Sequence, residues 1–264
     1  MASPHPQTLT WWRPPMPREH GAWVQLIAAT AAGLAMALHP LDPWLLALAV
    51  WLLFLAREPL AVALGHRTTR RREAEGTLRM RQAAALGGVA LVLAFLALDQ
   101  RWEALVQPLA VAGAVGGLAA AMVLFDRDRS PSGEVAAAWA VAAVAGLLAQ
   151  AGGAHPLVGQ ALLLSWGSAF ALDTLAVHAA KIRMLTANPP LWARHAWLPL
   201  GLTALGLGAW LRADYGDPPA ATVWLVGGGG ALGGALVQRP RHLQIVGVAL
   251  AVLCAAALFP WIAA

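Results

Sequence analysis

The chain has 264 residues, of which 59% are hydrophobic and 12% are charged, and its formal net charge at neutral pH is +5. Because soluble globular domains carry about twice that fraction of charged residues, the composition excludes an ordinary soluble protein. The single cysteine, Cys254, excludes a disulfide framework and a cysteine-based zinc site.

Apolar stretches recur along the whole chain, and each is long enough to cross a hydrocarbon core about 30 Å thick. The breaks between them carry proline, glycine or charge. We therefore predict an all-α polytopic membrane protein with nine transmembrane helices. A polar cytoplasmic leader over 1–20 precedes them, and 1–264 form a single transmembrane domain. The predicted spans are 21–38, 43–65, 82–98, 104–124, 134–151, 157–180, 194–211, 219–237 and 243–262.

The basic residues divide unevenly between the two sides of these spans. One side receives nearly all of the 18 lysines and arginines, including those of "HRTTRRREAEGTLRMR", whereas the other receives only Arg101 and Arg212. By the positive-inside rule, this asymmetry predicts that the N-terminus is cytoplasmic and the C-terminus lies outside.

Four ionisable residues fall at membrane depth, where charged groups are costly and usually face the protein interior or a water-filled cavity. Arg57 and Glu58 lie in the second predicted span, and Asp173 and His178 lie in the sixth. At 1.5 Å per residue, Arg57, Glu58 and Asp173 are about 12 Å from the cytoplasmic boundary, and His178 is one turn and a half closer to the surface than Asp173. Because a lone buried charge is unfavourable, we predict that Arg57 and Asp173 pair directly or through one water.

Further polar residues mark the cytoplasmic ends of other spans, and we interpret them all as one polar pocket that opens toward the cytoplasm. Each also has an ordinary structural role open to it, as an ion pair between helices, a helix cap or an orientation charge. The candidate ligand-binding residues are Arg57, Glu58, Asp173, His178, Lys181, Arg183, His20, Trp23, Glu134 and Arg127.

Motifs for catalysis or metal binding are missing from the sequence. There is no Ser-His-Asp spacing, no HExxH and no Cys/His cluster, so the sequence predicts no metal site and identifies no catalytic residue or cofactor. The glycine-rich "VGGGGALGGALVQ" lacks the strand and the Lys-Ser/Thr pair of a phosphate loop, and we interpret it as a close helix contact. Membrane lipids are the expected partners, and nucleic acid is not.

Two segments carry a family resemblance. "PREHGAW" at Pro17 to Trp23 and "FLAREPL" at Phe54 to Leu60, with the spacing of the later spans, resemble the YwiC-like family of bacterial membrane proteins. The resemblance covers most of the chain. It implies a multi-pass protein of the bacterial cytoplasmic membrane, and it implies no particular activity.

The chain more distantly resembles the UbiA-type prenyltransferases, which also have nine helices, a cytoplasmic N-terminus and a membrane-embedded site that faces the cytoplasm. The likeness rests on "FDRDRSPSGEVAAAWA" and on "ALDTLAVHAAK", which sets Asp173 and Thr174 at the start of the second acidic motif. It implies a UbiA-like bundle.

The UbiA type uses two Asp-rich motifs to hold Mg²⁺ and a diphosphate, and magnesium requires hard oxygen ligands. Here the first motif reads Arg57-Glu58-Pro59, and the second keeps only Asp173. Prenyl transfer by that mechanism is therefore not predicted, and whether the protein is an enzyme stays open.

The leading functional hypothesis is a pocket that binds, and in its extended form modifies, an isoprenoid, a quinone or another lipid-like ligand. In this hypothesis Arg57, Lys181 and Arg183 hold the polar head of the ligand. The alternative is a proton-coupled secondary transporter, because charge pairs and a titratable histidine in the membrane suit coupled transport. A third hypothesis is a non-catalytic accessory membrane subunit.

Overall fold

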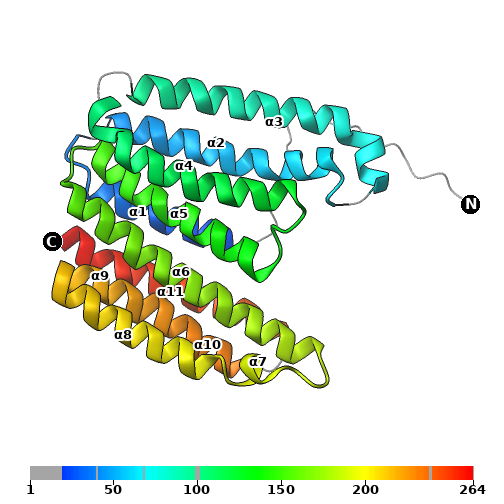
Figure 1. The fold of residues 1–264 in the computed structure, drawn as a ribbon, viewed down its shortest axis with the longest axis vertical. Helices are drawn as coiled ribbons and strands as arrows, with labels where there is room; N and C mark the ends of the chain where they lie inside the picture. Colours follow the sequence, from blue (N-terminus) through cyan, green and yellow to red (C-terminus); the bar gives the residue numbers. More distant parts are fainter. Residues whose placement is uncertain (1–19, 40, 68, 99–101, 238–239, 264) are drawn as a thin grey trace, which may run out of the picture.

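The computed structural model describes residues 20–39, 41–67, 69–98, 102–237 and 240–263, without the side chains of 20, 69–72 and 240–244. All regular elements in these ranges are helical. Figure 1 shows the long helices side by side in one bundle, with α3 along one edge and α8 along the opposite edge. In chain order the elements are α1 (His20–Ala35), α2 (Leu41–Leu64), α3 (Thr69–Leu98), α4 (Trp102–Leu124), α5 (Pro131–Ala151), α6 (Pro156–Leu185), α7 (Leu191–His195), α8 (Trp197–Tyr215), α9 (Asp217–Thr222), the π-helix η1 (Val223–Gly228), α10 (Gly229–Leu236) and α11 (Pro240–Ala263).

The nine apolar segments predicted from the sequence fall mainly on helical chain, although the first extends past the end of α1 at Ala35 and the seventh includes the turn at Ala196. The eighth segment corresponds to α9, η1 and α10 in succession, where one wide π turn interrupts an otherwise continuous helix. Six helices of the described residues are long and apolar enough to cross a membrane, namely α2, α3, α4, α5, α6 and α11. The prediction of an all-helical chain with membrane-spanning segments is confirmed.

Helix α3 is longer than its predicted span. It begins at Thr69, although the sequence predicted a charged loop up to residue 81. Arginine, glutamate, leucine and methionine are good helix formers. The carboxylate of Glu75 also lies 2.6 Å from the guanidinium of Arg79, one turn later on the same helix. The helix therefore continues past the apolar stretch into the basic segment.

The centre of the bundle is formed by α5 and α6, which pack against each other and connect the two halves of the chain. In their apolar windows 61% and 67% of the residues are buried, compared with 6% in α4. Alanine dominates this contact, and Ala142 and Ala145 of α5 and Ala169 of α6 are all fully inaccessible. Small side chains allow helix backbones to approach closely, which is how helices associate in a membrane.

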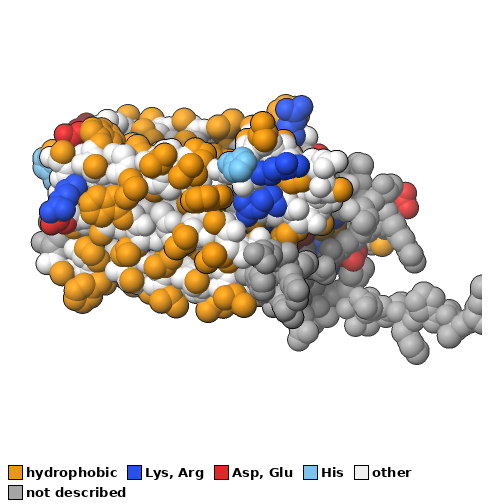
Figure 2. All heavy atoms as spheres, turned by 90° about the horizontal axis from the view of Figure 1, so that it is seen from below, with side chains coloured by type: hydrophobic (Ala, Val, Ile, Leu, Met, Phe, Trp, Pro, Cys, Tyr) orange, Lys and Arg blue, Asp and Glu red, His pale blue; other side chains and the backbone are white. Residues whose placement is uncertain are grey.

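Apolar side chains also cover much of the outside of the bundle. Large hydrophobic residues such as Leu91, Phe95 and Phe259 are each about 70% exposed, at 70%, 68% and 73%. Figure 2 shows hydrophobic side chains over the middle of one face, while lysine and arginine gather near its two ends. Such a surface suits a hydrocarbon surrounding, and with the six apolar helices it identifies a multi-pass integral membrane protein.

Candidate functional site

The α4–α5 loop turns the chain back at what we call the ion-pair end of the bundle, where α2 ends and α5 begins. Asp126 takes a left-handed conformation with φ of 55°, which aspartate tolerates better than most residues. Ser130 then caps α5, since its hydroxyl accepts a hydrogen bond from the amide of Gly133 at 3.1 Å. A methyl group at Gly133 would collide with the carbonyl of Arg127. The left-handed conformation of Asp126 and the cap at Ser130 therefore fix the two ends of the α4–α5 loop.

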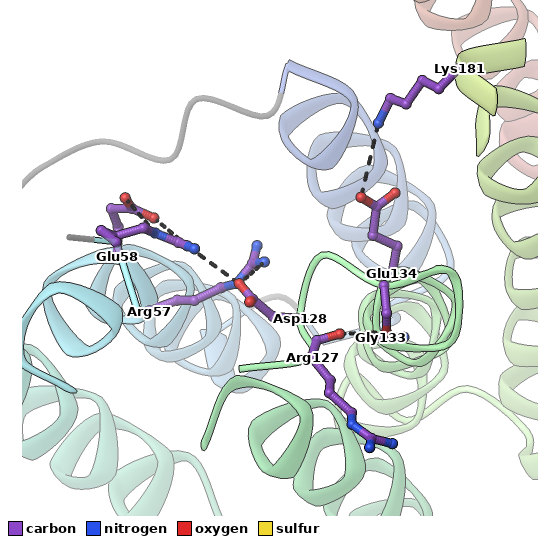
Figure 3. A network of polar contacts seen from close by, with 9 residues as sticks. Arg57, Glu58, Arg127, Asp128, Gly133, Glu134 and Lys181 are labelled. Atoms are coloured by element: carbon purple, nitrogen blue, oxygen red, sulfur yellow. Dashed lines mark hydrogen bonds and ion pairs between the residues drawn. The ribbon is translucent and has the colours of Figure 1, made fainter. Parts of the chain in front are cut away.

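This loop directs Asp128 into a buried ion-pair network (Figure 3). Oδ2 of Asp128 lies 3.0 Å from Nη2 of Arg57 and 3.3 Å from Nη2 of Arg67. Arg67 also donates two hydrogen bonds to Glu58, at 3.1 and 2.9 Å. Asp128 and Glu58 are only 4% and 9% exposed. The network joins the end of α2 to the α4–α5 loop.

Each charged group of this network favours the ionised form of its partner. Burial would raise the pKa of Asp128, but the guanidinium groups of Arg57 and Arg67 outweigh it and hold that pKa below its ordinary value. Burial would lower the pKa of Arg67, but Glu58 and Asp128 hold it above its ordinary value. Asp128 and Arg67 are therefore both charged at neutral pH.

An aromatic group lies one helical turn away from the network on α2. The ring centroid of Trp23, from α1, is 5.9 Å from that of Trp51 and 4.8 Å from that of Phe54, and the contact with Phe54 is edge-to-face. Phe54 precedes Arg57 by three residues, so both lie on one side of α2. All three rings are partly buried.

A second polar group connects α5 and α6. Nε2 of His178 lies 2.9 Å from Oε2 of Glu134, although the two atoms are not aligned for a hydrogen bond. Nζ of Lys181 lies 4.0 Å from Oε1 of the same carboxylate (Figure 3). The side chain of Lys181 is 42% exposed, so this group opens to the surroundings.

The predicted pair of Arg57 and Asp173 is wrong. Arg57 contacts Asp128, and Asp173 is buried against α10, where a methyl group at Gly230 would lie 2.8 Å from its Oδ1. The pair was predicted from depth alone, and depth does not specify the direction in which a side chain leaves its helix. The contact surfaces of α2 include α3, α4 and α5, whereas Asp173 faces the other half of the bundle.

The remaining candidates have separate positions. Arg183 donates to the backbone carbonyls of Ala193, at 3.2 Å, and Gly234, which ties α6 to α7 and α10. Arg127 is exposed in the α4–α5 loop, and Figure 3 shows its side chain directed away from Asp128. His20 begins α1, but its side chain lies outside the described residues.

Asp128, Arg67, Trp51 and Phe54 belong to the site but were not predicted from the sequence. Asp128 lies in "FDRDRSPSGE", at the end of the bundle where polar groups were expected, which was a usable signal. Within the described ranges, no three His, Cys, Asp or Glu side chains come together in a way that could hold a metal ion.

The comparison with protein families agrees with the first resemblance. The family model described as YwiC-like protein matches residues 16–149, just over half of the chain. The chain belongs to the YwiC-like family. No curated protein and no solved structure matches it. The matched part of this YwiC-like protein contains Trp23, the Arg57–Asp128 network and Glu134, whereas Asp173, His178 and Lys181 follow it.

Proposed function

We propose that this YwiC-like protein crosses the bacterial cytoplasmic membrane nine times as a UbiA-like bundle, with its N-terminus in the cytoplasm and its C-terminus outside. Two observations support the proposal. The nine predicted segments fall mainly on helical chain, and most basic residues of the described chain lie in or beside the connections at the ion-pair end. Basic loops remain cytoplasmic in multi-pass proteins, which makes the ion-pair end the cytoplasmic one.

The proposed function is the binding of an amphipathic, lipid-like ligand, an isoprenoid or a quinone, at the cytoplasmic end. The observation that carries this proposal is the position of the aromatic group relative to the charges. Phe54 lies one turn before Arg57 on the same side of α2, and its partly buried ring contacts that of Trp23 from α1, which also contacts Trp51. Ligand sites combine apolar and aromatic walls with a few charged groups that fix orientation.

In this arrangement the tail or ring of the ligand contacts the aromatic group, and its polar head contacts the guanidinium of Arg57. The Glu134–His178–Lys181 group lies at the same end of the bundle, and Lys181 supplies a second, half-exposed cation for an anionic head. Arg183 would act indirectly in this proposal, because it holds the end of α6 against α7 and α10.

Binding can be tested on the full chain purified in mild detergent. Mass spectrometry of the extracted lipids would identify a co-purified prenyl or quinone species, and titration with a short-chain quinone and a prenyl alcohol would give the affinity. An aromatic contact contributes about 1 kcal/mol beyond its buried area, so Trp23→Ala should weaken binding roughly fivefold.

The matched control is Trp210→Ala, which removes a tryptophan from α8 that contacts Tyr215 with ring centroids 6.0 Å apart. This variant should leave the affinity unchanged. Absence of both a co-purified species and measurable binding would contradict the proposal, and so would equal losses in the two tryptophan variants.

One observation favours the alternative, a proton-coupled secondary transporter. His178 and Glu134 form a titratable pair between α5 and α6, with 2.9 Å between Nε2 and Oε2. Flux of a solute in proteoliposomes that follows an imposed pH gradient and disappears in His178→Gln would support transport over simple binding. If neither binding nor flux is found, the third hypothesis, an accessory membrane subunit, would gain support.

A further inference from the structure

Asp173 lies deep inside the bundle on α6. At 1.5 Å per residue, it is about 18 Å from the end of α6 at Leu185 and about 26 Å from its start at Pro156. The residue is only 8% exposed, and its Oδ1 has no hydrogen-bond partner. Buried polar groups in proteins are nearly always hydrogen-bonded, so this orphaned oxygen requires an explanation.

The surroundings of Asp173 offer no positive charge. No described lysine, arginine or histidine lies within ion-pair distance of its carboxyl group. On the α10 side the neighbour is backbone, because a methyl group at Gly230 would lie 2.8 Å from Oδ1 and 2.9 Å from Cα of Asp173. On the α11 side Cys254, close enough to interact with it electrostatically, belongs to an apolar cluster that also contains Ala169 and Phe170.

Other titratable groups on α6 and on the elements packed against it lie nearer the two ends of the bundle. Sequence positions in η1 and α10 contribute none. Among the described side chains, the groups toward the ion-pair end are Glu134, His178, Lys181, Arg183, Arg194 and His195, and those toward the opposite end are His155, Arg212, Asp214, Tyr215 and Asp217.

An ionised carboxylate in this position would have neither a countercharge nor a full set of hydrogen bonds, which is strongly unfavourable in a low-dielectric interior. A protonated carboxyl avoids most of that cost. We propose that Asp173 is an intramembrane proton-binding site, which holds its proton at neutral pH and exchanges it with the ion-pair end through His178 and Glu134.

The path leads from Asp173 to the contact between α5 and α6. His178 is five residues beyond Asp173, about 7.5 Å along the helix axis and about 140° around it, so the proposed transfer between the two side chains runs through bridging waters. The imidazole takes up a proton on one nitrogen and releases one to the carboxylate of Glu134, 2.9 Å from Nε2. Glu134 is 25% exposed and passes the proton to water. Each step moves one proton and restores the charge of the preceding group.

The protonation state can be tested with a hydrophobic carbodiimide on the full chain in detergent at neutral pH. The acid proton moves to a carbodiimide nitrogen while the carboxylate oxygen adds to the central carbon, and rearrangement gives a stable N-acylurea with no leaving group. Peptide mass spectrometry should find the adduct on Asp173 and not on the exposed Asp214, and labelling should be lost in Asp173→Asn but not in Asp214→Asn.

Because the label is located in the wild-type chain, this test does not require that Asp173→Asn folds. Labelling of other carboxyl groups with none on Asp173 would overturn the proton-binding site. The water-soluble analogue of the reagent should label Asp214 and leave Asp173 unmodified, and the reverse pattern would equally contradict a buried acid.

The route is tested by infrared spectroscopy in proteoliposomes. The C=O band of the protonated acid should shift when the protein is transferred to D₂O, and His178→Gln should slow that shift. His195→Gln, which changes an exposed histidine on α7, is the matched control and should exchange at the wild-type rate. Equal rates in both variants would overturn the route. This proposal is independent of the lipid-like ligand, since it stands even if no ligand binds.

Discussion

Replacing Asp128 with leucine removes the carboxylate that joins the α4–α5 loop to α2. This carboxylate lies 3.0 Å from Arg57 and 3.3 Å from Arg67, and the side chains of Asp128, Arg57 and Arg67 are 5%, 18% and 8% exposed. Removing one partner of a buried pair costs about 3–5 kcal/mol, because the other charge remains buried. Arg67 keeps both of its bonds to Glu58. We therefore expect a loss of stability near the lower limit, about 3 kcal/mol.

For a protein of this size 1 kcal/mol corresponds to about 2–4 °C in the melting temperature, so Asp128→Leu should lower it by about 6–12 °C. The assay is thermal unfolding of the purified chain in mild detergent. Arg57→Met should be comparably destabilising, and the double variant should recover much of the loss, because it buries neither charge alone.

The control pair is Arg212 and Asp217, which has the same 3.0 Å separation but side chains that are 61% and 76% exposed. Exposed pairs contribute little, so Arg212→Met should change the melting temperature only slightly. The reasoning would be refuted if the losses from Asp128→Leu and Arg57→Met simply add in the double variant. It would also be refuted if Asp128→Leu were no more damaging than Arg212→Met.

Three further predictions use the same unfolding assay. Since the pKa of Asp128 is held below its unfolded value of about 3.9, its stabilisation is complete above that value and is lost as the pH falls through the lower, folded pKa. The melting temperature in acid should therefore fall more steeply for the wild type than for Asp128→Asn, and parallel curves would contradict this. Gly230→Ala should cost about 1–3 kcal/mol because the new methyl group meets Asp173, whereas Gly228→Ala, with no atom within 4 Å, should not. Ser130→Ala should cost about 1 kcal/mol through loss of the α5 cap, and an unchanged melting temperature would show that the cap is unimportant.

The helices of this chain could be predicted because lipid leaves few alternatives. A backbone within hydrocarbon must satisfy its own hydrogen bonds, so a long apolar stretch is a helix whatever its neighbours are. That constraint does not apply to the basic segment at the start of α3, which is outside the apolar stretch. Its helix depends on propensity and on pairs such as Glu75 and Arg79. It also does not reveal the π turn between α9 and α10, because hydropathy is insensitive to the winding of a helix.

The directions of the candidate side chains could not be predicted from the sequence. The rise per residue predicts similar levels for Arg57 and Asp173, yet the two side chains face different halves of the bundle. Asp128 was overlooked because it belongs to an alternating run of acids and bases from 126 to 129, in which every member resembles a surface charge. Which member turns inward depends on the left-handed Asp126 and on the cap at Ser130, and neither is visible in composition.

The π turn at Val223–Gly228 also fixes how the helix that follows is rotated about its axis. Gly230 and Gly234 both face α6, where methyl groups on them would lie 2.8 Å from Oδ1 of Asp173 and 3.0 Å from Cβ of Ala176. A residue removed from the turn would restore α-helical winding and rotate both glycines by about 100° away from α6. Side chains would then occupy a seam that has room only for backbone. The number of residues in η1 therefore determines whether Gly230 and Gly234 face α6.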